Sequence, residues 1–73
     1  MPDHVYKIVE IVGSSEIGVD DAIRTAVTRA SQSLHSLDWF EVVETRGHIQ
    51  DGHVVHFQVT LKLGFKLEFP KSA

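Results

Sequence analysis

The sequence predicts a small α+β domain in which one helix packs on a three-stranded antiparallel sheet, in the order β-α-β-β. Three observations support this fold. Apolar residues recur at helical spacing between about 18 and 36. The dipeptide Asp51-Gly52 is typical of a tight hairpin turn. Apolar and polar residues then alternate from 55 to 68, as in a strand with one buried face.

The first strand and the helix follow each other closely. Residues 5–12 are β-branched and aromatic with a charge on each face, and they predict a strand. Neither face is cleanly polar, which suggests that both are covered, one of them by another subunit. Ser15 or Gly18 is placed to cap the helix expected at about 18–36. Its apolar stripe consists of Val19, Ala22, Ile23, Ala26, Val27, Ala30, Leu34 and Leu37.

The other two strands form a hairpin. A second strand is expected at 39–46, and the Asp51-Gly52 turn joins it to the third because both turn residues tolerate positive φ. The third strand is the longest and has one apolar and one polar face, so we place it in the middle of the sheet. The predicted strand order is therefore 2-3-1, with the helix packed across one face of the sheet.

The only tryptophan is expected to point away from the helix. With a two-residue turn, Trp39 lies opposite Gly64, whose missing side chain leaves open space. An exposed aromatic there needs a partner, and another subunit, a stacked planar ligand and a loop all remain open. Gln58 lies on the same face and offers a donor and an acceptor to a heterocycle, although exposed strand glutamines are common. Since about 20 Å separates Gln58 from Gly64 at ~3.3 Å per residue, a ligand could contact Trp39 and Gln58 only between subunits.

The far end of the second strand fits this register poorly. Thr45 falls opposite Gln58, and both Glu44 and Arg46 then point to the apolar face. Either a β-bulge shifts the strand, or its end runs beyond the helix. Arg46 could hold an anionic group there, or it could be a solvated charge.

Composition restricts the classes of protein. The 73 residues, taken as 1–73, suffice for one domain, with a tail from about 69 to 73 expected to be disordered. The net charge of −3 offers no basic stripe, so we expect no nucleic-acid partner. No apolar stretch reaches the ~20 residues that span a membrane, and no signal peptide is evident, so a cytoplasmic location is expected. The chain has no cysteine, and its short length favours self-association as the way to complete a thin core.

Few residues are arranged for catalysis or metal binding, and we do not expect an enzyme. His48, His53 and His56 gather near the hairpin, but their spacing matches no zinc motif, so we expect no metal site and leave their role open. Two alternatives remain. Loss of Met1 would expose Pro2, the kind of N-terminal proline that small oligomeric tautomerases use as a general base. The chain could also form a ligand-free oligomeric scaffold.

Segments from about residue 4 to 68 together resemble dodecin, a family of small flavin-binding proteins. The segments are specific as a set rather than singly. They are Val5-Tyr6-Lys7, Glu10-Ile11-Val12-Gly13-Ser14-Ser15, Leu37-Asp38-Trp39-Phe40-Glu41-Val42, Arg46-Gly47, Phe57-Gln58-Val59-Thr60 and Gly64-Phe65-Lys66-Leu67-Glu68. The resemblance implies a protomer whose sheet wraps its helix and which assembles with itself into a hollow homododecamer.

The resemblance also implies a site. Paired flavins would stack between tryptophans at subunit contacts, with a glutamine at the isoalloxazine edge, and Trp39 and Gln58 match these positions. The implied flavin is FMN, with riboflavin or FAD possible, and Arg46 would lie near its phosphate, with Asp38 as a weaker match. Such a protein would store the flavin and quench its photochemistry. Some members also bind coenzyme A through basic residues, whose nearest counterparts here are Tyr6, Arg29 and Lys66.

Overall fold

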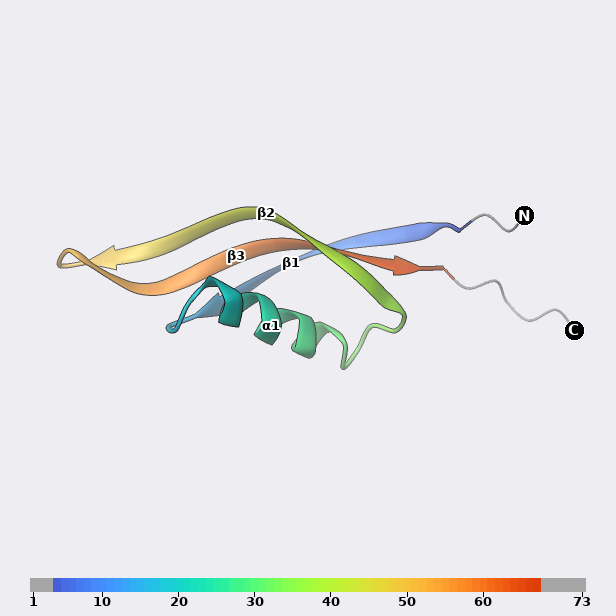
Figure 1. Ribbon diagram of the computed structural model, residues 1–73, viewed down its shortest axis with the longest axis horizontal. Coiled ribbons are helices and arrows are strands. Elements are labelled where there is room, and N and C mark those ends of the chain that lie inside the picture. Colours follow the sequence, from blue (N-terminus) through green and yellow to red (C-terminus); the bar gives the residue numbers. More distant parts are fainter. Residues whose placement is uncertain (1–3, 68–73) are drawn as a thin grey trace, which may run out of the picture.

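The structure is a computed structural model and describes residues 4–67. It contains β1 (Tyr6–Ser15), α1 (Val19–Ala30), β2 (Leu37–Gln50) and β3 (His53–Lys66). The three strands form one antiparallel sheet in the order β1-β3-β2, and α1 runs along one side of it (Figure 1). The predicted α+β class, element order and central position of the third strand are confirmed.

Two predictions made from the sequence concern residues outside this range. The tautomerase alternative depends on Pro2, and the expected tail begins at about residue 69. Among residues 4–67, no helix has the length and hydropathy needed to cross a membrane.

The helix is shorter than predicted, because it ends at Ala30 instead of about residue 36. The amide of Leu34 still bonds the Ala30 carbonyl at 2.8 Å, but the residues between them form a turn. Ser31 donates its hydroxyl to the Thr28 carbonyl at 2.8 Å, a local bond that competes with a regular helix. Ser36 has a φ of 64°, in the left-handed region that ordinary helices do not use. The helical spacing of apolar residues in the sequence therefore extends beyond Ala30, where the helix ends.

The start of the helix is held by Ser15 from outside it. Gly18 occupies the N-cap position and makes no side-chain cap. The Ser15 hydroxyl accepts a hydrogen bond from the Ile17 amide at 2.9 Å and donates one to the Asp21 carboxylate at 2.7 Å. These two bonds tie the end of β1 to the first turn of α1.

The core lies where α1 meets β1 and β3. Its buried cluster consists of Ala22, Ala26, Val59 and Leu61. Small side chains let the helix approach the sheet closely at Gly13. A Cβ at that position would lie 2.6 Å from the carbonyl oxygen of Ala22 and 2.7 Å from the Cβ of Ala26. Glycine at residue 13 is therefore a packing requirement.

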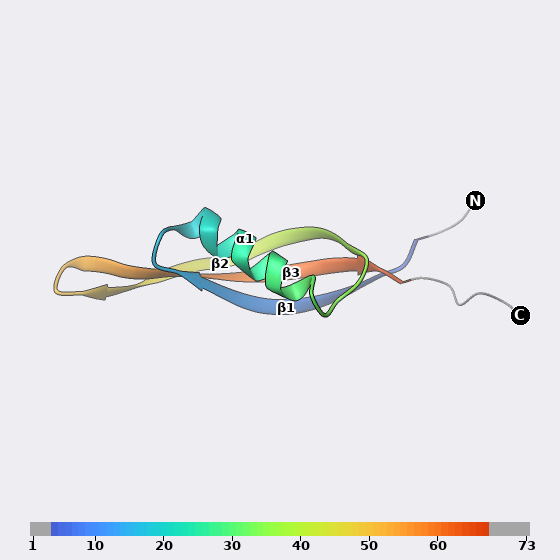
Figure 2. The same ribbon diagram turned by 90° about the horizontal axis from the view of Figure 1, so that it is seen from below.

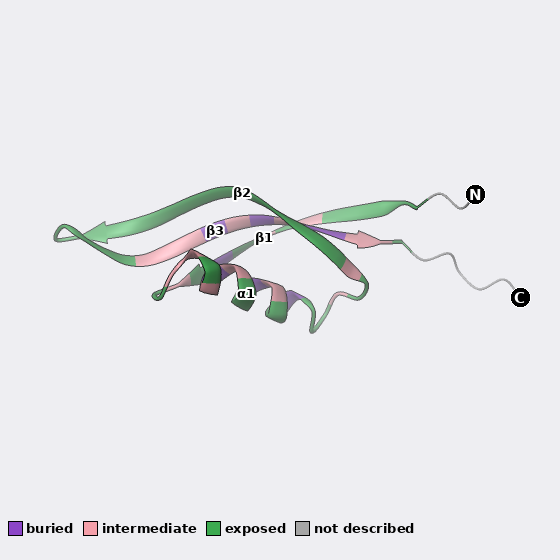
Figure 3. Ribbon diagram, viewed as in Figure 1, coloured by how far each residue is buried: buried purple, intermediate pink, exposed green. Residues whose placement is uncertain are grey.

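Strand β2 is left uncovered by the helix. Every residue from 38 to 50 is exposed, whereas the buried residues lie on β3, on α1 and, at Gly13, on β1 (Figure 3). Phe40 and Val42 are 50% and 41% exposed, although they lie opposite buried residues of β3. The hairpin end of β2 and β3 also extends beyond the start of α1 (Figure 2). A single chain thus leaves apolar surface in water that further copies would cover.

The hairpin turn is as predicted, but the pairing register of β2 with β3 changes along the length of the hairpin. Asp51 and Gly52 have φ of 52° and 79°, as a type I′ turn requires. Trp39 pairs with Gly64, as expected. Between turn and base, one bulge adds Val55 to β3 and a second adds Val43 to β2.

The bulges correct the predicted pairing of Gln58. Its partner on β2 is Arg46, and the expected pairing with Thr45 is wrong. Thr45 instead faces Val59 in the core layer, while Glu44 faces Thr60. The shift moves both charged side chains from the apolar face to the polar face, which removes the conflict that the sequence presented.

Candidate functional site

Trp39 lies on the face of the sheet opposite to α1. Its indole covers Gly64, because a Cβ there would overlap Cε2 and Cζ2 of the ring. The open space predicted beside Gly64 is therefore filled by the tryptophan itself. The ring of Tyr6 stands beside it, with centroids 6.4 Å apart and planes tilted by 59°. Trp39 is 38% exposed, so an indole supported from below still presents surface to a partner.

A second group of polar side chains lies further along the same face. Arg46 on β2 is directly opposite Gln58 on β3, and Ser14 on β1 is opposite Gln58 on the other side. The guanidinium of Arg46 lies 2.9 Å from the carboxylate of Glu44, and both side chains are more than half exposed. An amide and a guanidinium are thus neighbours on one outward surface.

These two groups do not meet within one chain. Along β3, Thr60 and Lys62 lie between Gln58 and Gly64 on the same face. Six residues of strand correspond to about 20 Å. A ligand that touches both Trp39 and Gln58 must therefore lie between two copies of the chain.

The remaining residues predicted to contact a ligand lie on different elements of the chain. Asp38 is exposed at an irregularity just before Trp39, where it has no direct partner on β3. Tyr6 and Lys66 are paired across β1 and β3 on the tryptophan face. Arg29 lies on α1, which packs against the other face. The structure brings Tyr6 and Lys66 together but not Arg29, so a coenzyme A site using all three would also need several copies.

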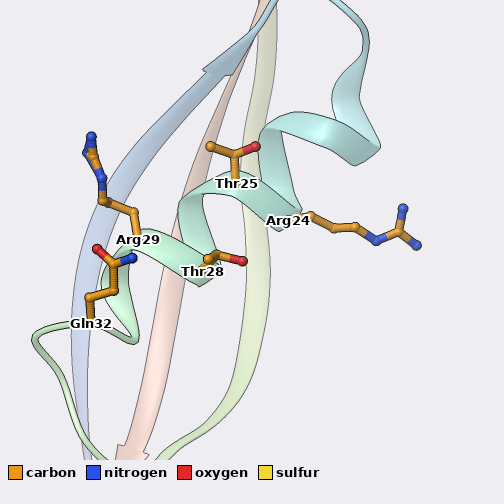
Figure 4. A pocket seen from close by; sticks show the side chains of 5 residues that line it. All are labelled: Arg24, Thr25, Thr28, Arg29 and Gln32. Carbon is orange, nitrogen blue, oxygen red and sulfur yellow. The ribbon is translucent and has the colours of Figure 1, made fainter.

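A surface hollow of about 300 Å³ lies over the outer side of α1. Figure 4 shows its lining, in which the long side chains of Arg24 and Arg29 extend in different directions. All of the lining residues are exposed, and all belong to this helix and the turn after it: Arg24, Thr25, Thr28, Arg29 and Gln32. The hollow therefore lacks the enclosure and converging polar groups of a ligand site.

Sequence reasoning missed two neighbours of the site. It did not identify Glu44 as the ion-pair partner of Arg46 or Tyr6 as the ring beside Trp39. The first could have been found, since residues 44 and 46 are two apart in a strand and therefore lie on one face. The second depends on the register between β1 and β3, which places Tyr6 opposite Lys66, two residues from Gly64, and for which the sequence carries no separate signal.

The fold and this outward face define a class of protein: a small α+β subunit with an uncovered apolar strand and an exposed indole on the face of the sheet opposite to its helix. The family model described as Dodecin matches residues 5–68. A curated dodecin from Thermus thermophilus is 53% identical over 64 residues, which cover 88% of this chain and 93% of that protein. The chain belongs to the dodecin family.

Solved structures of dodecins have the same fold as this chain. The structure of dodecin from Streptomyces coelicolor is similar with a TM-score of 0.87 at 60% identity, covering 96% of this chain and all of that one. A more distant relative is the calcium dodecin of Mycobacterium tuberculosis, whose structure is described with a calcium-binding site. That structure has a TM-score of 0.75 at 26% identity, and the match covers 94% of this chain and 99% of that one. Dodecins are small oligomeric proteins that bind flavin, and the chain is a flavin-binding protein in this general sense.

Proposed function

We propose that this chain stores and buffers FMN and quenches its photochemistry, as a hollow homododecamer whose flavins lie between subunits. The observation that carries the proposal is the position of Trp39. Its indole lies over Gly64, is 38% exposed, and faces away from the helix. A flat aromatic surface held in this way is suited to stacking, and two copies face to face would enclose planar rings between two indoles.

Stacking supplies both affinity and quenching. Aromatic stacking on nucleic-acid bases is worth about 1–3 kcal/mol per ring, and we take this as the scale for an isoalloxazine on Trp39. An indole in contact with the excited ring can transfer charge to it. The excited state then decays without emission and without reacting with oxygen, which protects the cell from its own flavin.

Gln58 and Arg46 would contribute from a neighbouring copy. The Gln58 amide can both donate to and accept from the polar edge of the ring. Arg46 carries a fork of N–H donors that suits a phosphate, and the register places it directly opposite Gln58. In the free chain Glu44 holds this guanidinium at 2.9 Å, so an FMN phosphate would compete with a carboxylate for it.

Titration of FMN with flavin-free protein tests the proposal. We expect wild-type protein to quench flavin emission and Trp39→Ala to bind FMN roughly 5- to 150-fold more weakly, which corresponds to about 1–3 kcal/mol. Trp39→Phe keeps an aromatic ring but loses the indole. Its affinity for FMN should therefore fall less, relative to wild type, than its quenching of flavin emission. Emission that persists at excess protein would contradict the proposal, and an intact colourless oligomer would instead favour a ligand-free scaffold.

The role of Arg46 can be separated from that of the ring contacts. Arg46→Gln should weaken FMN binding by about tenfold, because a hydrogen bond to a charged group is worth about 1.5–3 kcal/mol and this one is largely solvated. Riboflavin binding should stay unchanged, since riboflavin has no phosphate. As the matched control, Glu44→Gln frees the guanidinium and should strengthen FMN binding. Equal losses for FMN and riboflavin in Arg46→Gln would rule out the phosphate role.

A further inference from the structure

Two histidines form a pair that the function above does not use. His48 on β2 lies directly opposite His56 on β3. Their rings are stacked, with centroids 5.5 Å apart and planes only 12° from parallel. Strand β1 pairs with β3 only from Phe57 onward, so both histidines lie on the two-stranded part of the hairpin. This part extends beyond α1 (Figure 1).

The pair exists because of a bulge. Counted from the Asp51-Gly52 turn, a regular hairpin would place His48 opposite Val55 and leave His56 opposite Gly47. The extra residue in β3 shifts the pairing so that the two imidazoles face each other. Bulges often redirect a side chain next to a functional site.

The chemistry of the pair fits a metal ion better than a structural contact. His48 is exposed and His56 only half-buried, and neither imidazole has a hydrogen-bond partner within residues 4–67. Cross-strand neighbours have Cβ atoms about 4.5–5.5 Å apart, so a modest rotation of each ring can direct one nitrogen from each to a common ion. The nearest cation on this face, Arg46, is already paired with Glu44 at 2.9 Å.

We propose that His48 and His56 form a two-nitrogen binding site for a borderline divalent transition metal, with Cu²⁺ the tightest. Imidazole suits zinc, copper and nickel, and copper is the strongest of these in the general order of affinities. Within the described range no three His, Asp or Glu residues are arranged around a metal position, so the remaining ligands would be water or a group from another molecule. Calcium prefers oxygen ligands, so this site differs in kind from a calcium site.

The sequence could not have shown the pair. His48 and His56 are eight positions apart with a turn between them, which matches no metal-binding spacing on a helix or in a zinc finger. The expectation of no metal site rested on that spacing. Strand pairing and one bulge supply the proximity instead.

The test is a Cu²⁺ titration of flavin-free protein, followed by calorimetry and by electron paramagnetic resonance. We expect one ion per chain and splitting from two equivalent nitrogens. His48→Gln and His56→Gln should each weaken binding by at least about tenfold, since even groups outside the ligand set are worth that much. The double variant should lose the two-nitrogen signal.

Two further variants make the result decisive. His35→Gln changes an exposed histidine away from the hairpin and should bind Cu²⁺ as wild type does. His53→Gln changes a neighbour of the pair and should also leave the signal intact. A two-nitrogen signal that survives in the double variant, or an equal loss in His35→Gln or His53→Gln, would overturn the assignment. Because no flavin is present, this result is independent of FMN binding.

Discussion

An alanine at position 64 is expected to remove most flavin binding, although residue 64 has no side chain to offer a ligand. The added methyl group would overlap the six-membered ring of Trp39. The indole would have to leave its support on β3, and the stacking surface would lose its orientation. Gly64→Ala should therefore weaken FMN binding about as much as loss of the indole does, roughly 5- to 150-fold.

The same flavin titration measures this effect, and a second glycine controls for it. Gly18 has an extended backbone and no heavy atom within 4 Å of an added Cβ, so Gly18→Ala should bind FMN normally. If Gly64 acts through Trp39, the double variant that combines Gly64→Ala with Trp39→Ala should bind FMN as tightly as the weaker-binding of the two single variants. Wild-type affinity in Gly64→Ala, or fully additive losses, would show that the two residues act separately.

Replacing Gly13 with alanine is expected to have the largest effect on folding. The new Cβ would lie 2.6 Å from the Ala22 carbonyl oxygen, a backbone atom that cannot rotate away. The helix would have to move off the sheet at the centre of the core. Overpacking of this kind lowers the free energy of unfolding by about 1–3 kcal/mol. This is a large part of the total free energy of unfolding of a small domain.

Thermal unfolding and sedimentation would measure the consequence. Gly13→Ala should lower Tm and reduce the fraction of fully assembled protein, because each subunit would present a displaced helix to its neighbours. Gly18→Ala is again the matched control, since it introduces the same methyl group where no atom lies nearby. A Gly13→Ala protein that unfolds at the wild-type Tm would mean that α1 lies further from β1 than the structure places it.

The fold was predictable because its signals were local and strong. The alternation of residues 55–68 predicted the long central strand, and Asp51-Gly52 predicted the turn. The end of the helix was not predictable from apolar spacing, because Leu34 and Leu37 continue the apolar spacing after the helix has ended at Ala30. Hydrophobic periodicity reports which side chains face the core, and it does not report where the helical hydrogen bonds end.

The candidate site was predictable only in part. The pairing of Trp39 with Gly64 followed from the turn, and so did the separation of Trp39 from Gln58 along β3. The bulges were suspected because Glu44 and Arg46 pointed the wrong way, but their positions could not be deduced. Consequently the neighbour of Gln58 was misassigned. A bulge is decided by side-chain packing on both faces of a ribbon, which a single strand pattern does not contain.

The bulges also have a consequence for the shape of the subunit. Val55 is the additional residue in β3, and Val43 and Asp38 are the additional residues in β2. The pairs Gln50–His53 and Trp39–Gly64 therefore keep the alignment set by the turn, while the segment between Val43 and Val55 is displaced by one residue. Bulges bend and twist a ribbon locally. The bend and twist of the hairpin between Trp39 and Gln58 are thus set as the single chain folds, before any two copies meet.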